Sequence, residues 1–123
     1  MSAVVDTGVL IDALRANGPA VETLASLYPV PICSEISRVE ILRGMRSAER
    51  QATQALLEQL MWVPLDQAIS ARAGELGRRY RASYPGLGAA DLVVAATALH
   101  LNRPLITTNV RHFPMFEDLK PPY

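Results

Sequence analysis

Four short apolar runs, separated by stretches long enough for helices, constrain the fold of this chain more than any other feature. The runs end near residues 5, 33, 65 and 107, and a fifth run at 115–119 is expected to add an edge strand. Helical patterns are expected at 9–15, from 19 onward, and at 34–45, 48–60, 66–82 and 89–101. Strands that alternate with helices are typical of a parallel sheet covered on both faces. We therefore predict an α/β fold with a parallel sheet of four to five strands and helices on both faces.

Local signals refine several of these helices. Asp66 is expected to cap the long helix, and either Ser34 or Ser37 to cap the helix after the second strand. The helix at 89–101 is apolar nearly all round, which predicts a central position. In the segment 48–60 the residues expected to face inward are Ala52, Ala55, Leu56 and Leu60.

Size and composition describe a compact globular protein. With 123 residues, of which 50% are hydrophobic and 20% charged, we expect one domain spanning 1–123. The apolar run at 92–99 is too short to cross a bilayer, and the first residues show no secretory pattern. Cys33 is the sole cysteine, so no internal disulfide forms, and it reads as a small buried side chain at a strand end. These features predict a cytoplasmic protein that does not enter a membrane.

The charge balance argues against a protein that coats nucleic acid, because the formal net charge is zero. An enzyme that cuts nucleic acid remains compatible with it. The basic residues are mostly arginines in two groups, and we expect most of them to lie on solvated helix faces, paired with Glu35, Glu49 and Glu75. The groups are Arg38, Arg43, Arg46 and Arg50, and then Arg72, Arg78, Arg79 and Arg81.

Polar side chains recur where a strand or loop turns into a helix, in otherwise apolar surroundings. They are Asp6, Glu40, Asp91 and Asn109. Each acid has an ordinary explanation, since Asp6 fits a helix cap, Ser37-x-x-Glu40 a capping box, and Asp91 an acid in a first helical turn. In parallel sheets, ligands bind beyond the carboxyl ends of the strands, where Asp6 and Asn109 are expected. Together, the positions favour one shared site over three unrelated caps.

Such a site requires a cation. Two carboxylates about 4 Å apart repel by about 4 kcal/mol at an effective dielectric near 20, and a bound cation reverses the sign of that interaction. An all-oxygen set without cysteine or paired histidines is typical of Mg²⁺ or Mn²⁺. An acidic metal site on a small α/β domain indicates phosphodiester chemistry.

Four segments resemble the signature segments of PIN-domain proteins, and most closely the VapC-type toxins of bacterial toxin–antitoxin pairs. They are VVDTGVLID at 4–12, SRVEILRG at 37–44, DLVVAATA at 91–98 and TTNVRHF at 107–113. The resemblance covers the whole chain in order, and it implies a small PIN-like domain. It also implies a Mg²⁺- or Mn²⁺-dependent endoribonuclease, a homodimer, and neutralisation by a cognate VapB-type antitoxin.

Carried over by position, the resemblance makes Asp6, Glu40, Asp91 and Asn109 the catalytic residues, with Asp6 and Asp91 as metal ligands. Thr7 and Thr107 match hydroxyl positions that orient the first carboxylate or bind a phosphate. Asn109 is a departure, because many PIN proteins have an aspartate there. An amide adds no charge, so we expect one firm metal site, with a second site completed by RNA phosphate.

Other residues and other functions fit the sequence less well. His112 is expected to be a hydrogen-bonded structural residue, while Asp12, Glu117 and Asp118 are expected on the surface. A phosphorylated receiver domain needs an acidic pair after the first strand, and Asp6 is single. The alternative that stays open is a catalytically weak PIN-like scaffold that binds RNA or protein. The identity of the RNA is open as well, although single-stranded loops are the accessible targets.

Overall fold

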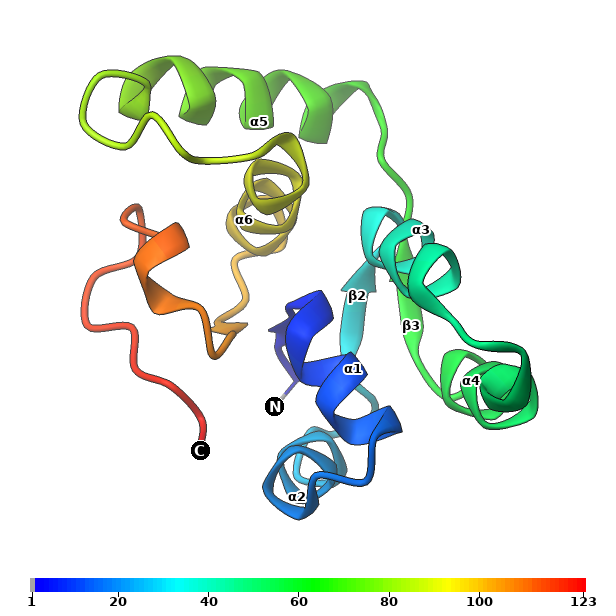
Figure 1. Cartoon of the computed structure of the whole chain (residues 1–123). Coiled ribbons are helices and arrows are strands. Elements are labelled where there is room, and N and C mark those ends of the chain that lie inside the picture. The colour runs from blue at the N-terminus through cyan, green and yellow to red at the C-terminus, as the bar shows by residue number, and fades with distance from the viewer. Residues whose placement is uncertain (1) are drawn as a thin grey trace.

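The structure, a computed structural model, describes residues 2–123 (Figure 1). Its strands are β1 (Val4–Val5), β2 (Ile32–Ser34), β3 (Met61–Val63) and β4 (Leu105–Ile106). Its α-helices are α1 (Thr7–Leu14), α2 (Gly18–Ala25), α3 (Glu35–Gly44), α4 (Arg50–Leu57), α5 (Gln67–Tyr80) and α6 (Ala89–Leu101). Short 3-10 helices, η1 (Ser47–Glu49) and η2 (Val110–His112), precede α4 and follow β4.

The strands form one parallel sheet in the order β3-β2-β1-β4. Val4 is paired with Ile32 on one side and with Leu105 on the other. The central strands are short and almost fully buried, as expected for a parallel sheet with helices on both faces. The predicted α/β class is confirmed, with four strands among residues 2–123.

Alternate residues of the strands supply two separate cores. Val4, Ile32 and Leu105 pack with α5, α6 and Phe113, whereas Val5 and Cys33 pack on the other face with α1, α2 and α4. This follows from the two-residue period of a strand, which sends neighbouring side chains to opposite faces. α6 lies against β1 and β2, and α5 crosses over it (Figure 1). The predicted central position of α6 is thus confirmed.

Close packing of α5 on α6 explains a glycine in the middle of α5. A Cβ atom at Gly77 would lie 2.9 Å from Cδ1 of Leu92 on α6, which is too close for an unadjusted contact. Gly77 therefore allows the two helices to approach, and this fixes the position of the first turn of α6, where Asp91 lies.

The structure confirms one local prediction and contradicts two others. Asp66 caps α5, accepting a hydrogen bond from the N–H of Ile69, as predicted. Ser34 caps α3, so the capping-box interpretation of Ser37 is wrong, because Ser37 lies inside that helix. The edge strand expected at 115–119 is also wrong. These residues form turns, and Met115, Phe116 and Leu119 pack against the core without joining the sheet.

The α-helix predicted at 48–60 starts later than expected and buries different residues. Its first turn is η1, and α4 starts only at Arg50. As a result, Thr53 and Leu57 are the buried residues of α4, while Ala52 and Ala55 are exposed. Over residues 2–123, no helix combines the length and the apolar character needed to span a membrane.

Candidate active site

Asp6 lies where β1 ends and α1 begins, and neighbouring donors hold both of its carboxylate oxygens. The side chain caps α1 by accepting a 2.9 Å hydrogen bond from the backbone N–H of Thr7. The other oxygen accepts a 2.7 Å hydrogen bond from the hydroxyl of Thr107, which directly follows β4. Because β1 and β4 are adjacent in the sheet, these residues meet although they are 101 positions apart. Asp6 therefore serves as a helix cap and at the same time lines a pocket.

Glu40 is held by the first residue of α1. The hydroxyl of Thr7 lies 2.7 Å from Oε1 of Glu40 and 2.8 Å from Oγ of Ser37. A hydroxyl has a single proton, and the stronger bond is to the carboxylate, so Thr7 donates to Glu40 and accepts from Ser37. Ser37 and Glu40 are three residues apart on α3, so both face α1. The side chain of Thr7 thus orients Glu40, and only its backbone N–H contacts Asp6.

Asp91 reaches the site from the first turn of α6. Its Oδ2 lies 2.9 Å from Nδ1 of His112, and Nδ2 of Asn109 lies 2.9 Å from the same ring nitrogen. The backbone N–H of Asn109 donates to the hydroxyl oxygen of Thr107 at 2.9 Å. The side chain of Asp91 is 25% exposed and that of His112 is 46% exposed. This part of the site is an open rim.

A pocket of about 500 Å³ collects these side chains beyond the carboxyl ends of the strands. Its lining residues come from α1, α3, α6 and the segment after β4. They are Asp6, Thr7, Gly8, Ile11, Glu40, Arg43, Gly44, Asp91, Thr108 and Asn109. The structure thus brings together the four positions that the sequence pattern selected, and Thr107 lies directly behind Asp6.

Comparison with known proteins identifies the family. Residues 3–117 match the family model described as PIN domain. The chain belongs to the PIN-domain family.

Two curated relatives and one solved structure resemble this PIN-domain chain over nearly its whole length. Ribonuclease VapC19 of Mycobacterium tuberculosis is 41% identical over 97% of this chain and 98% of its own. Ribonuclease VapC10 of the same organism is 43% identical over 97% of this chain and 91% of its own. A toxin-antitoxin complex from Klebsiella pneumoniae superposes with a TM-score of 0.85 and 27% identity, covering 98% of each chain.

The electrostatics of the PIN-domain site centre on Asp6. Burial raises the pKa of the Asp6 carboxyl above its ordinary value, and the nearby acids Asp91 and Glu40 raise it further. The hydrogen bonds from Thr107 and Thr7 act in the opposite direction and favour the ionised form. Within residues 2–123, Asp6 forms no ion pair with an arginine, lysine or histidine. The buried carboxylate therefore lacks the compensating positive charge that a bound cation supplies.

The donor set fits a hard divalent cation. Carboxylate oxygens of Asp6 and Asp91 and the side chain of Asn109 line the same pocket, and all are of the type that Mg²⁺ and Mn²⁺ prefer. In the part of the chain that the structure describes, no group of three or more acidic, histidine or cysteine side chains converges closely enough to hold one ion. Mg²⁺ ligation typically uses one or two carboxylates and keeps several waters.

Two residues of this arrangement were not selected as site residues from the sequence. Ser37 was considered only as a cap, but it is fully buried and contacts Thr7. His112 was interpreted as structural, yet it contacts the proposed ligand Asp91. For Ser37, the available signal is its spacing of three residues from Glu40 on one helix. No local signal predicts the contact between His112 and Asp91, because it joins η2 to α6.

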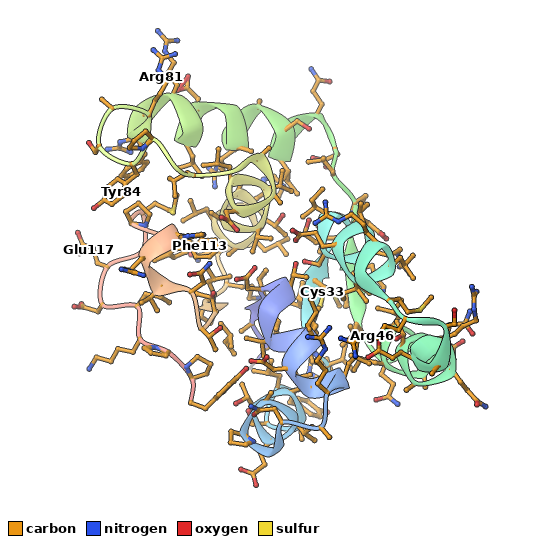
Figure 2. The ribbon with its side chains drawn as sticks, in the orientation of Figure 1. Cys33, Arg46, Arg81, Tyr84, Phe113 and Glu117 are labelled. Atoms are coloured by element: carbon orange, nitrogen blue, oxygen red, sulfur yellow. The ribbon has the colours of Figure 1, made fainter. Side chains whose placement is uncertain are left out.

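Other candidate residues lie away from the pocket. Glu117 and Asp118 are exposed, as expected, and Figure 2 shows Glu117 on the outer side of the C-terminal segment. Asp12 is only partly exposed, because it accepts a hydrogen bond from the hydroxyl of Tyr123 at 2.5 Å. Cys33 is fully buried, as predicted, and burial raises the pKa of its thiol to about 12. It is an inert core residue.

The arginines are mostly exposed, as expected, but the expected ion pairs with Glu49 and Glu75 do not form within residues 2–123, and Glu49 instead accepts a hydrogen bond from the backbone N–H of Arg46. Arg38 pairs with Glu35 at 2.6 Å and stacks over the ring of Trp62. Arg46 and Arg81 are exposed, and Figure 2 shows Arg81 at the edge of the molecule beyond α5. Arg43 is different, because it lines the acidic pocket and, within residues 2–123, makes no ion pair.

Proposed function

We propose that this PIN-domain protein is a VapC-type toxin, a metal-dependent endoribonuclease that hydrolyses RNA phosphodiester bonds. The observation that carries the proposal is the single pocket that unites Asp6, Glu40, Asp91 and Asn109. The similarity to two curated VapC ribonucleases, at 41% and 43% identity, supports the same activity. The fold, shared with a chain of a toxin-antitoxin complex, supports the toxin role.

Asp6 and Asp91 would hold Mg²⁺ or Mn²⁺ in this pocket. Such an ion would supply Lewis-acid polarisation of the phosphodiester and would lower the pKa of a water nucleophile. The chain's own residues hold the ligands in place. Thr107 and the N–H of Thr7 fix Asp6, and the Thr7 hydroxyl fixes Glu40 at the pocket wall, where its carboxylate can accept a hydrogen bond from water.

RNA would enter on the side of Arg43. A guanidinium that lines an acidic pocket without an ion-pair partner there is suited to a phosphate oxygen of the substrate. Removing the charge in Arg43→Gln should raise KM for RNA with a smaller effect on kcat, because a guanidinium that pairs with a substrate phosphate contributes chiefly to binding. An unchanged KM would exclude Arg43 from RNA binding.

We propose that a cognate VapB-type antitoxin neutralises the protein by covering an apolar groove of about 890 Å³. The groove lies between α2, α4 and the start of β3, and a small pocket links it to the acidic pocket. That small pocket shares Leu14 with the groove, and Ile11 and Gly44 with the acidic pocket. An apolar antitoxin helix would fill the groove, and a basic residue beyond it would reach the acids. This arrangement would block the metal site directly.

A pair of substitutions tests the groove. Val21, 47% exposed, lines it, whereas Leu65, 45% exposed, does not. Val21→Glu should weaken binding of the cognate antitoxin in a calorimetric titration, while Leu65→Glu should leave it unchanged. Equal affinities for the two variants would place the antitoxin elsewhere.

Three further features belong to the same proposal. The resemblance to VapC-type toxins implies a homodimer, which sedimentation equilibrium of the purified protein would test. Residues 1–123 would form one PIN-like domain, which would unfold in a single transition. The unpaired Cys33 supports a location in the reducing cytoplasm.

Cleavage of RNA by the purified protein tests the proposed activity and separates it from a non-cleaving scaffold. Total cellular RNA is incubated with wild-type protein and Mn²⁺, with wild-type protein and EDTA, and with Asp91→Asn and Mn²⁺. Discrete cuts in the first reaction alone would support a metal-dependent nuclease. Equal cutting by Asp91→Asn would show that the activity is contamination or that the site is wrong. If RNA binds in every reaction and none is cut, the scaffold function is correct.

A further inference from the structure

Beyond the ligands themselves, we infer that His112 is a positioning residue that donates its Nδ1 proton to Asp91 and thereby links the two sides of the site. The inference deepens the proposed function and rests on it. A continuous series of hydrogen bonds supports it, running from Asp6 through the Thr107 hydroxyl to the backbone of Asn109, and from the Asn109 side chain to His112 and Asp91. The segment 107–112 thus contacts both proposed metal ligands.

The placement of protons at His112 decides its role. Nδ1 of this ring lies 2.9 Å from the Asp91 carboxylate and 2.9 Å from the amide of Asn109. If the amide nitrogen donates to a bare Nδ1, the ring's lone pair faces a carboxylate oxygen, and that contact is repulsive. If Nδ1 carries the proton, it donates to Asp91. Rotation of the Asn109 side-chain amide that exchanges its oxygen and nitrogen leaves the outline of the side chain unchanged, and the oxygen then becomes a second acceptor for Nδ1. The second arrangement gives both oxygens a donor and removes the repulsion between the ring nitrogen and the carboxylate.

Asp91 depends on this contact more than Asp6 depends on any single neighbour. Asp6 is 8% exposed and has two bonded donors. The side chain of Asp91 is 25% exposed, and within residues 2–123 its recorded hydrogen-bond partner is His112 alone. Without that donor the carboxylate is free to adopt other rotamers. A hydrogen-bond donor at Nδ1 of His112 therefore restricts the side-chain rotamer of Asp91, a proposed metal ligand that α6 alone does not hold in one rotamer.

The ring of His112 is itself anchored from behind. η2 is closed by a hydrogen bond from the His112 N–H to the carbonyl of Asn109. The next residue, Phe113, is 1% exposed and packs into the core with α6, edge-on to Phe116 (Figure 2). The buried phenyl ring fixes η2 on the core, so the imidazole is held at the rim although it is half-exposed.

The first test reads the proton directly. The chain has two histidines, so a long-range ¹H–¹⁵N spectrum of metal-free protein at pH 8 contains two rings, and His100→Gln assigns them. The inference predicts that Nδ1 of His112 carries a proton. A bare Nδ1, with the proton on Nε2, would overturn it. This measurement needs neither metal nor RNA, so it decides the inference even if the protein proves not to be a nuclease.

The second test measures Mn²⁺ affinity by titration calorimetry. Residues that support a metal ligand typically contribute about 10- to 100-fold in affinity, and the half-exposed ring predicts a loss of about tenfold in His112→Leu. His112→Asn places an amide N–H near the Nδ1 position and should retain most of the affinity, whereas His100→Gln should match wild type. Wild-type affinity in His112→Leu would contradict the inference, as would an equal loss in His112→Asn and His112→Leu. Absence of Mn²⁺ binding in the wild-type protein would instead count against the proposed function.

Discussion

The two halves of the site are built in different ways. The buried half consists of Asp6, Thr7, Ser37 and Thr107, each less than 9% exposed, and it forms where β1, β4, α1 and α3 meet. The rim half consists of Asp91, Asn109 and His112, which are partly exposed and joined through one ring nitrogen. Folding of the sheet fixes the buried half, whereas local contacts between α6 and η2 fix the rim. Changes in the buried half should therefore alter stability in addition to any effect on metal binding, and changes at the rim should chiefly alter metal binding.

Removal of the Thr107 hydroxyl should have the largest effect on stability. Thr107 is fully buried, donates to Asp6 and accepts from the N–H of Asn109. Thr107→Val keeps the shape but leaves both partners unsatisfied, so the free energy of unfolding should fall by about 1–3 kcal/mol. Urea unfolding measures this loss.

A buried threonine outside the site provides the matched control. The Thr97 hydroxyl bonds the carbonyl of Val93 within α6, so Thr97→Val removes no partner from a carboxylate. Its effect on the free energy of unfolding should be smaller than that of Thr107→Val. Equal losses would show that the contact between Thr107 and Asp6 does not matter for stability.

The charge of Asp6 should make metal-free stability depend on pH. Its pKa in the folded protein is raised above the ordinary value of 3.8, chiefly by burial. A raised pKa means that the folded state favours the protonated form, so the contribution of this group to stability is complete below pH 3.8 and is lost as the pH rises through the folded pKa. Asp6→Asn lacks this loss. In EDTA, its Tm relative to wild type should rise by a few degrees between low pH and pH 8.

The quantity to compare is how the difference in Tm between Asp6→Asn and wild type changes with pH. Its value at a single pH also contains the effect of the altered hydrogen bond to Thr107. If the difference in Tm between Asp6→Asn and wild type is constant across the pH range, ionisation of Asp6 does not destabilise the folded protein.

Addition of charge at the rim should have the smallest effect. Asn109→Asp supplies the carboxylate that many PIN proteins have, and an acidic side chain can still accept a hydrogen bond from Nδ1 of His112. Mn²⁺ should bind a few-fold more tightly or with a second ion, and calorimetry reports both. Weaker binding would mean that the amide, rather than a charge, is what the rim requires.

The sequence predicts the fold, but in each half of the site it misses one residue, Ser37 in the buried half and His112 at the rim. Alternating strands and helices set the class, and α6 begins and ends where its apolar pattern predicted. Asp6 was placed correctly because a strand end leads directly into a helix cap. The register of α4 was missed, because η1 shifts its start and brings Thr53 inward where the pattern favoured Ala52.

Contacts between distant segments were beyond sequence reasoning. Thr7 and Glu40 are 33 positions apart, and His112 and Asp91 are 21 positions apart. Within its own segment His112 resembles a turn residue before Phe113, and its role depends on how α6 packs against η2. Such contacts depend on how whole helices and strands pack together, and the periodicity of the sequence within one element does not predict that packing.

Binding of Mn²⁺ to metal-free protein tests the central claim most directly, because the account requires Asp6 from the buried half and Asp91 from the rim to share one ion. Calorimetry on wild type, Asp6→Asn and Asp91→Asn gives the affinity and the number of ions bound per chain. We predict one firmly bound ion in the wild type and its loss in both variants. Wild-type binding in either variant would show that the two halves do not form one metal site.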